Sequence, residues 1–140
     1  CAGYKLCPQD WQLHEDRCYR LSKEIGKWDQ SKTDCENQDS QLVVLRDEKE
    51  KEYIKNLMGR STQPVWIGLS LLQKEWRWVD NTTFDTKKFG TLPGVGCGTL
   101  KNKELEIDGC DSEHKWVCQK KSFQLSPAMA EDDEQYTGTI

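Results

Sequence analysis

Seven cysteines in 140 residues limit what this chain can fold into more than any other feature of its sequence. None forms a Cys-x-x-Cys motif and only two histidines are present, so the ligand spacing of a structural zinc site is missing. Disulfides are the better interpretation, and they place the protein in an oxidising compartment, either secreted or on the outer face of a membrane. Six cysteines can pair within the chain. Cys1, ahead of the periodic sequence, is the candidate for a bond between chains.

Length and charge exclude several classes of protein. The chain is close to the size of one domain, and no stretch approaches the roughly 18 to 20 apolar residues that a membrane span requires. Its 20 basic and 24 acidic residues give a net charge of -4, which argues against a surface for nucleic acid. Asn81-Thr82-Thr83 is a glycosylation sequon and agrees with a secretory route. We expect an excised or processed ectodomain whose targeting segment is not in the chain.

The first half of the chain predicts a hairpin, two helices and a buried strand. Aromatic and apolar residues at alternate spacing around residues 14–17 predict the hairpin, which a Cys7 to Cys18 bridge would close. Helical spacing from Trp28 puts Cys35 on the buried face of the first helix. Residues 41–45 form a short β-branched run typical of a strand, and Asp47 predicts the start of a second helix that stops at Gly59.

The second half predicts strands around one long loop. Residues 65–69 form an apolar strand in which Gly68 marks the close approach of another group, and residues 76–80 alternate as a strand. Residues 84–96 contain four glycines or prolines without a period, which predicts a loop and a candidate binding surface. Three short strands follow. We expect all six tryptophans in the core: Trp11, Trp28, Trp66, Trp76, Trp78 and Trp116.

These residues together resemble the C-type lectin-like domain. The motifs that carry the resemblance are Cys7-Pro8-x-x-Trp11, Cys18-Tyr19, Trp28, Cys35, Leu42, Trp66-Ile67-Gly68-Leu69, Trp76-x-Trp78, Cys97, Cys110 and Trp116-Val117-Cys118. The resemblance implies an α+β fold with two helices flanking two small antiparallel sheets and a long loop region. It also implies the bridges Cys7–Cys18, Cys35–Cys118 and Cys97–Cys110. The domain is then expected over residues 7–121, after a stalk remnant at 1–6 and before a disordered acidic tail at 122–140.

Calcium-dependent sugar binding in that family needs triplets that this chain lacks. Its sugar-binding members carry Glu-Pro-Asn or Gln-Pro-Asp in a loop and Trp-Asn-Asp in a strand, whereas this chain has Leu92-Pro93-Gly94 and Leu105-Glu106-Ile107. Calcium needs about six to eight oxygen ligands, which these residues do not supply. No metal or other cofactor is therefore expected. Glu104, Glu106 and Asp108 form an alternating acidic face, which is interpreted as a solvated strand face rather than a calcium site of another design.

Within the family, the missing triplets, the first hairpin and the phrase Cys110-Asp111-Ser112-x-x-x-Trp116-Val117-Cys118-Gln119-Lys120 are most similar to the natural killer cell lectin-like receptors. The resemblance implies the ectodomain of a single-pass type II receptor at the plasma membrane of a natural killer cell or other leukocyte. Such a receptor binds a cell-surface protein, lectin-like or MHC-like, and modulates cell activation. A homodimer linked through Cys1 is also implied. The alternatives are a carbohydrate-binding lectin, calcium-dependent or atypical, and the ligand member of a receptor pair.

A binding surface is predicted at the loop-bearing end, and an active site is not. The cysteines are expected in bridges, and His14 and His114 show no triad-like pattern, so an enzyme is not expected. The surface is a mixed-charge rim around one exposed aromatic residue, suited to electrostatically steered protein binding. Its candidate residues are Lys87, Lys88, Phe89, Lys101, Asn102, Lys103, Glu104 and Glu106, with Arg77 as a further candidate.

Overall fold

The computed structural model describes residues 4–72, 75–92 and 94–125, which divide into two compact units. The larger unit consists of residues 20–119, and the smaller one combines the two ends of the chain. Cys1, Pro93 and residues 126–140, including most of the predicted tail, lie outside the described residues. Within the described ranges, no helix has the length and apolar character needed to cross a membrane.

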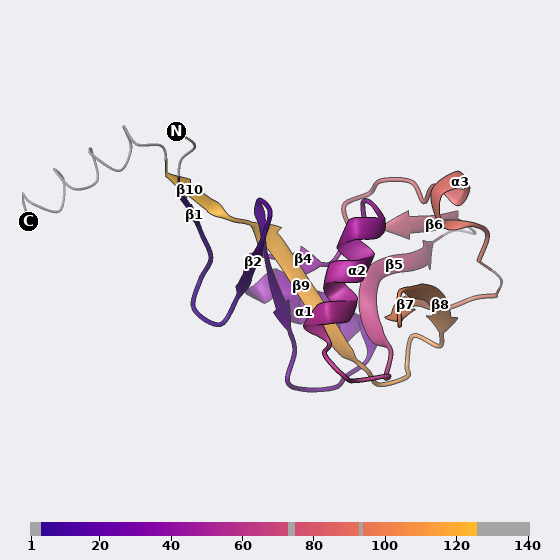
Figure 1. The fold of residues 1–140 in the computed structure, drawn as a ribbon. Helices are drawn as coiled ribbons and strands as arrows, with labels where there is room; N and C mark the ends of the chain where they lie inside the picture. The colour runs from indigo at the N-terminus through magenta and orange to yellow at the C-terminus, as the bar shows by residue number, and fades with distance from the viewer. Residues whose placement is uncertain (1–3, 73–74, 93, 126–140) are drawn as a thin grey trace, which may run out of the picture. The chain divides into compact units, whose positions relative to one another are not determined.

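The larger unit is built around strand β5 (Val65–Leu72) (Figure 1). It pairs antiparallel with β6 (Glu75–Trp78) and β7 (Cys97–Lys101), and parallel with β9 (Lys115–Lys121). Strand β7 continues into a hairpin with β8 (Glu104–Asp108), while the short β4 (Gln41–Leu42) pairs with β9. These positions confirm the strands predicted at 65–69 and 76–80 and the three short strands that follow, whereas only Gln41–Leu42 of the strand predicted at 41–45 is regular strand.

Gly68 lies where β5 passes close to other backbone. A Cβ atom at this position would lie 2.8 Å from the Leu42 carbonyl oxygen and 2.8 Å from Val79 Cγ2. The Gly68 N–H donates to the Val43 carbonyl (2.8 Å), and the Gly68 carbonyl accepts from the Val79 N–H (2.8 Å). The close approach that the sequence predicts is therefore confirmed, and any side chain here would push two segments off the strand.

Helix α1 (Trp28–Asn37) is held to the sheet by its buried face. Trp28 Nε1 donates to the Ile67 carbonyl at 2.9 Å, and Cys35 forms a disulfide with Cys118 of β9. At the start of the helix, the Lys27 N–H donates to Gln30 Oε1 at 2.8 Å, which satisfies a donor that the helix leaves open. The predicted helix and its core-facing cysteine are confirmed.

Helix α2 (Glu48–Leu57) begins at the predicted cap, with Asp47 Oδ1 accepting from the Glu50 N–H at 2.9 Å. It ends before Gly59, whose φ of 66° is the left-handed conformation expected of a helix stop. Glu50, on the buried face of this helix, is 3% exposed, and its carboxylate accepts from the Arg46 N–H (2.8 Å).

The predicted loop at 84–96 contains a short helix, α3 (Thr86–Phe89). Asp85 caps it, because Asp85 Oδ1 accepts from the Lys87 N–H at 2.9 Å. Gly90 ends it at a φ of 80°. Four residues are too few to show a helical period in the sequence, so the prediction of a loop without regular structure was wrong at this point.

The smaller unit combines a hairpin with a two-stranded ribbon. The hairpin joins β2 (Gln12–His14) to β3 (Arg17–Leu21), and the Cys7–Cys18 disulfide closes it. The ribbon pairs β1 (Tyr4–Leu6) with β10 (Phe123–Leu125). Segments assigned above to the stalk (1–6) and to the tail (122–140) therefore pair as strands, while the domain boundaries at 7 and 121 stay predictions. The three-residue strands are too short for a sequence pattern to reveal.

All three predicted bridges are present, including Cys97–Cys110 at the end of the β7–β8 hairpin. The tryptophans divide into two groups. Four are buried as predicted: Trp28, Trp66, Trp78 and Trp116. Trp76 and Trp11 are only half-buried, and in the smaller unit Lys120 Nζ lies 4.5 Å from the centroid of the Trp11 ring.

Candidate ligand-binding surface

Phe89 is the centre of an aromatic cluster rather than an exposed anchor. Its ring stacks on Phe84 at a centroid distance of 5.5 Å and meets Trp78 edge-on at 5.9 Å. Phe84 and Trp78 are 6% and 5% exposed, and Phe89 is half-buried between them. The predicted exposed aromatic was wrong, because the two partner rings remove much of its surface from water. The cluster fixes α3 against β6.

Two lysines cover the remaining face of the Phe89 ring. Lys88 Nζ lies 5.9 Å from its centroid, and Lys51 Nζ of α2 lies 5.7 Å away. Cations at this distance are attracted by the ring quadrupole. Lys51 also pairs with Glu48 at 3.0 Å. The sequence does not predict the contact of Lys51 with Phe89, because the two residues are 38 positions apart and belong to different helices. The one available signal is that Lys51 lies beside the buried face of α2.

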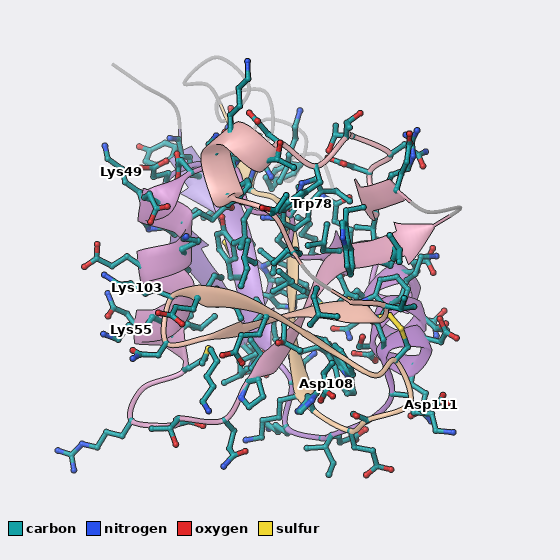
Figure 2. The ribbon with its side chains drawn as sticks, turned by 90° about the vertical axis from the view of Figure 1, so that its right-hand side faces the viewer. Lys49, Lys55, Trp78, Lys103, Asp108 and Asp111 are labelled. Carbon is teal, nitrogen blue, oxygen red and sulfur yellow. A yellow bond between two sulfur atoms is a disulfide. The ribbon has the colours of Figure 1, made fainter. Side chains whose placement is uncertain are left out.

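Lys87 and Lys88 are both exposed on α3, and the Lys88 ammonium also lies over the Phe89 ring. Their backbone is held by the Asp85 cap and by the aromatic cluster below them. Figure 2 shows Trp78 beneath this part of the ribbon. The structure thus presents two adjacent positive charges on a fixed support, which reduces the entropy lost when they bind an acidic surface.

The β7–β8 hairpin brings the other candidates together. Its turn consists of Asn102 and Lys103, with φ angles of 50° and 71°, and Lys101 pairs with Glu104 across the strands. These four residues and Glu106 are exposed, as predicted. Figure 2 shows Lys103 at the same edge of the larger unit as Lys49 and Lys55 of α2. Lysine in the left-handed region is strained, so the turn displays its charge at a conformational cost.

Arg77, the further candidate, forms its ion pair within its own strand rather than with α3 or the β7–β8 hairpin. Its Nη2 pairs with Glu75 Oε2 at 2.9 Å on the same strand, β6. Both side chains are substantially exposed, at 39% and 62%, so the pair is screened by water and contributes little to stability. Asn81, the sequon residue, is exposed in the turn that follows β6, with a φ of 70°.

The predicted acidic strand face is broken by a contact of its last member. Asp108 Oδ2 lies 2.6 Å from His114 Nε2. This hydrogen bond, aided by the Gly109 N–H and by Ser112, lowers the pKa of Asp108 against the opposing effect of partial burial. The His114 ring in turn meets Trp66 edge-on at 4.8 Å. Among residues 4–72, 75–92 and 94–125, no three His, Cys, Asp or Glu side chains are grouped so that they could hold a metal ion.

Residues 24–120 match the family model of the lectin C-type domain. The chain belongs to this family. It is 35% identical over 117 residues to C-type lectin domain family 2 member B of Homo sapiens, covering 83% of this chain and 76% of the relative. It is 29% identical over 132 residues to the killer cell lectin-like receptor subfamily B member 1B allele B of Mus musculus, covering 91% and 59%. The chain thus spans a little over half of that receptor's length.

A solved lectin domain supports the fold. The C-type lectin domain of murine dendritic cell inhibitory receptor 2, determined in complex with an N-glycan, superposes with a TM-score of 0.73 at 27% identity. The match covers 82% of this chain and 98% of that domain. The predicted fold class and the resemblance to natural killer receptors are confirmed. Membership identifies the chain as a lectin C-type domain, which belongs to a family of binding domains rather than of enzymes, and its relatives include proteins named killer cell lectin-like receptors.

Proposed function

We propose that this lectin-like domain binds a cell-surface protein without calcium, as the ectodomain of a leukocyte receptor that modulates cell activation. The proposed contact surface consists of α3 and the β7–β8 hairpin. The observation that carries the proposal is the support beneath Lys87 and Lys88, where Phe89 packs on Phe84 and Trp78. A rigid, charged surface of this kind suits rapid, electrostatically steered binding to a protein.

The chemistry of β8 supports independence from calcium. Ile107 occupies the position at which the sugar-binding members of the family are expected to carry the aspartate of Trp-Asn-Asp, and Leu105 occupies the position of the tryptophan. Both side chains are half-buried and hold no oxygen. Asp108, the half-exposed carboxylate that follows Ile107 on the strand, is engaged by His114 at 2.6 Å. A cation at this strand would therefore lack most of the six to eight oxygens that calcium takes.

Attachment to a cell remains part of the proposal. The relatives include proteins named as killer cell receptors, and the chain covers only 59% and 54% of the first two. We propose that the remaining length includes a membrane anchor in type II topology, that Cys1 joins two copies, and that Asn81 carries a glycan. The exposure of Asn81 supports the last of these.

Sugar binding is the second candidate, since the solved domain of murine dendritic cell inhibitory receptor 2 was determined with an N-glycan. A glycan array probed in calcium and in chelator separates the two candidates. Binding to glycans only in calcium would favour the lectin. The chemistry of β8 described above predicts no calcium-dependent glycan binding.

The experiment that tests the proposal is a binding screen of the chain against cell-surface proteins, in chelator, followed by charge reversal. The double variant Lys87→Glu/Lys88→Glu should weaken binding of the protein found by about tenfold or more, because steering and contact both reverse sign. Lys23→Glu/Lys115→Glu, an equal charge change at exposed lysines elsewhere in the larger unit, is the matched control. Equal binding of the two variants would place the contact surface elsewhere.

A further inference from the structure

Strand β8 ends in a chemically reactive pair of residues, Asp108 and Gly109. Asp108 is the only aspartate in the sequence that is followed by glycine, and no asparagine is followed by glycine. In such a pair the glycine nitrogen can attack the aspartate side chain, because glycine has no Cβ atom to hinder the approach. Both residues are accessible to water, since the Asp108 side chain is 44% exposed and Gly109 is exposed.

The folded chain holds the two reacting groups together. The Gly109 N–H donates to Asp108 Oδ1 at 2.8 Å. Because Oδ1 is bonded to Cγ, this contact also holds the nitrogen close to the carbon that it would attack. Reacting groups that the fold already positions lose less freedom on the way to the transition state, which favours the reaction.

The other carboxyl oxygen is held by His114. Asp108 Oδ2 lies 2.6 Å from His114 Nε2, and this hydrogen bond lowers the pKa of Asp108. A lowered pKa keeps the carboxyl ionised, and an ionised carboxyl resists a nucleophile because its oxygen cannot leave as water. His114 is itself fixed, since its backbone exchanges two hydrogen bonds of 3.0 Å with Gly26 and its ring meets Trp66 edge-on.

We propose that Asp108-Gly109 is a site of spontaneous isomerisation to isoaspartate, and that His114 restrains this reaction. The Gly109 nitrogen forms a bond to Asp108 Cγ. One carboxyl oxygen leaves as water, carrying its own proton and the proton released by the nitrogen. Water then adds to the five-membered imide. Opening at the main-chain carbonyl carbon leaves the chain connected through Cγ, which is isoaspartate, whereas opening at Cγ restores aspartate. The reaction needs no other co-reactant.

Isoaspartate would disturb the base of the β7–β8 hairpin, because it adds one carbon to the backbone. Asp108 pairs with Cys97 across the hairpin, and Cys97 forms the disulfide with Cys110. The backbone is tightly packed at this point, since a Cβ atom at Gly96 would clash with the Asp108 carbonyl oxygen. The added carbon therefore displaces neighbouring backbone, and the modified chain should have a lower melting temperature than the unmodified chain.

The test follows isoaspartate in the full chain during incubation at neutral pH. Peptide mapping with electron-transfer fragmentation distinguishes the two isomers, which have equal mass. Isoaspartate should accumulate at residue 108 well ahead of Asp111, an exposed aspartate followed by serine. Gly109→Ala should reduce the accumulation to the level at Asp111. This variant should fold, because the φ of Gly109 is not left-handed and an added Cβ would meet only Ser112 Oγ, at 3.7 Å.

His114→Gln tests the restraint. It should speed isomerisation at residue 108 by about threefold or more, because a higher pKa leaves more of the carboxyl protonated at neutral pH. Glu113→Gln, at the exposed neighbouring position, is the matched control. The rate at Asp111 should not change in either variant. In urea with the disulfides reduced, the original chain and His114→Gln should isomerise at the same rate, because the contact is lost.

Three results would overturn the proposal. Accumulation at residue 108 no faster than at Asp111 would remove the site. An unchanged or slower reaction in folded His114→Gln would remove the restraint by His114. Equal acceleration at residue 108 and at Asp111 would show that the substitution only loosens the turn. Gly109→Ala keeps the site testable if His114→Gln disturbs folding.

Discussion

Gln119 Nε2 donates to Glu50 Oε2 at 3.0 Å, joining helix α2 to strand β9 in the core of the larger unit. Both side chains are almost completely buried, at 1% and 3% exposed. Gln119 Oε1 also accepts from the Val44 N–H at 2.7 Å. One amide therefore satisfies a carboxylate and a backbone donor, neither of which can reach water.

We predict that Gln119→Leu destabilises the fold by about 2 to 4 kcal/mol, because it removes donors and acceptors from buried partners, one of them charged. Urea unfolding with the disulfides intact measures this free energy. Gln63→Leu, at an exposed position, is the control. In a double-mutant cycle, Glu50→Leu should cost less in the Gln119→Leu background than in the original chain. Additive effects would contradict the proposed coupling.

The turn at Asn102-Lys103 leads to a prediction of increased stability. Lys103→Gly should stabilise the domain by about 1 kcal/mol, because glycine adopts a positive φ without strain and Asn-Gly is favoured in two-residue hairpins. The same substitution within α2, Lys55→Gly, should destabilise by about 1 kcal/mol. Thermal unfolding compares the two variants. A lower melting temperature for Lys103→Gly would contradict the prediction, because it would show that contacts of the lysine side chain stabilise the fold by more than the backbone strain destabilises it.

Phe89 and Lys87 should respond differently to mutation, since one is packed and the other exposed. Phe89→Ala should lower the free energy of unfolding by about 1 to 3 kcal/mol, less than a fully buried phenylalanine, and should weaken ligand binding by releasing α3. Lys87→Glu should weaken binding with a change in stability below about 0.5 kcal/mol. Chemical denaturation and binding are measured on both variants. If Phe89→Ala left stability unchanged, the aromatic cluster would have no structural role.

Much of the scaffold could be predicted because its signals are local or repeated. Trp28 and Cys35 reveal a helical face by spacing alone, and Gly68 reveals a close approach because a larger residue would clash there. The binding surface was harder to predict. Nothing in Lys87-Lys88-Phe89 indicates that the ring packs on Phe84 and Trp78, since these contacts depend on how β6 and α3 fold together.

Long-range pairing also explains what was missed at the ends of the chain. Leu6 and Phe123 are 117 positions apart and each belongs to a three-residue strand, so neither segment has enough length to show a pattern. The contact of Asp108 was missed for a similar reason. Glu104, Glu106 and Asp108 alternate in sequence, but the approach of His114 from a following turn gives Asp108 a separate role.

The Asp108–His114 contact makes stability depend on pH. Because the folded pKa of Asp108 is lowered, its contribution is present above the unfolded value of about 3.9 and is lost as the pH falls through the folded value. The side chain is 44% exposed, so solvent screening keeps the effect within about 1 kcal/mol. The stability lost in Asp108→Asn should therefore shrink below about pH 4. Exposed Asp111→Asn is the control (Figure 2), and a loss that is constant with pH would contradict the assignment.

The central claim is that this domain works without calcium, and thermal unfolding in millimolar calcium and in chelator tests it most directly. An ion bound only to the folded state at 100 times its dissociation constant adds about 2.7 kcal/mol, which raises the melting temperature of a domain of this size by several degrees. We predict the same melting temperature in both solutions. A calcium-dependent rise would contradict the account and direct attention to the exposed carboxylates of β8.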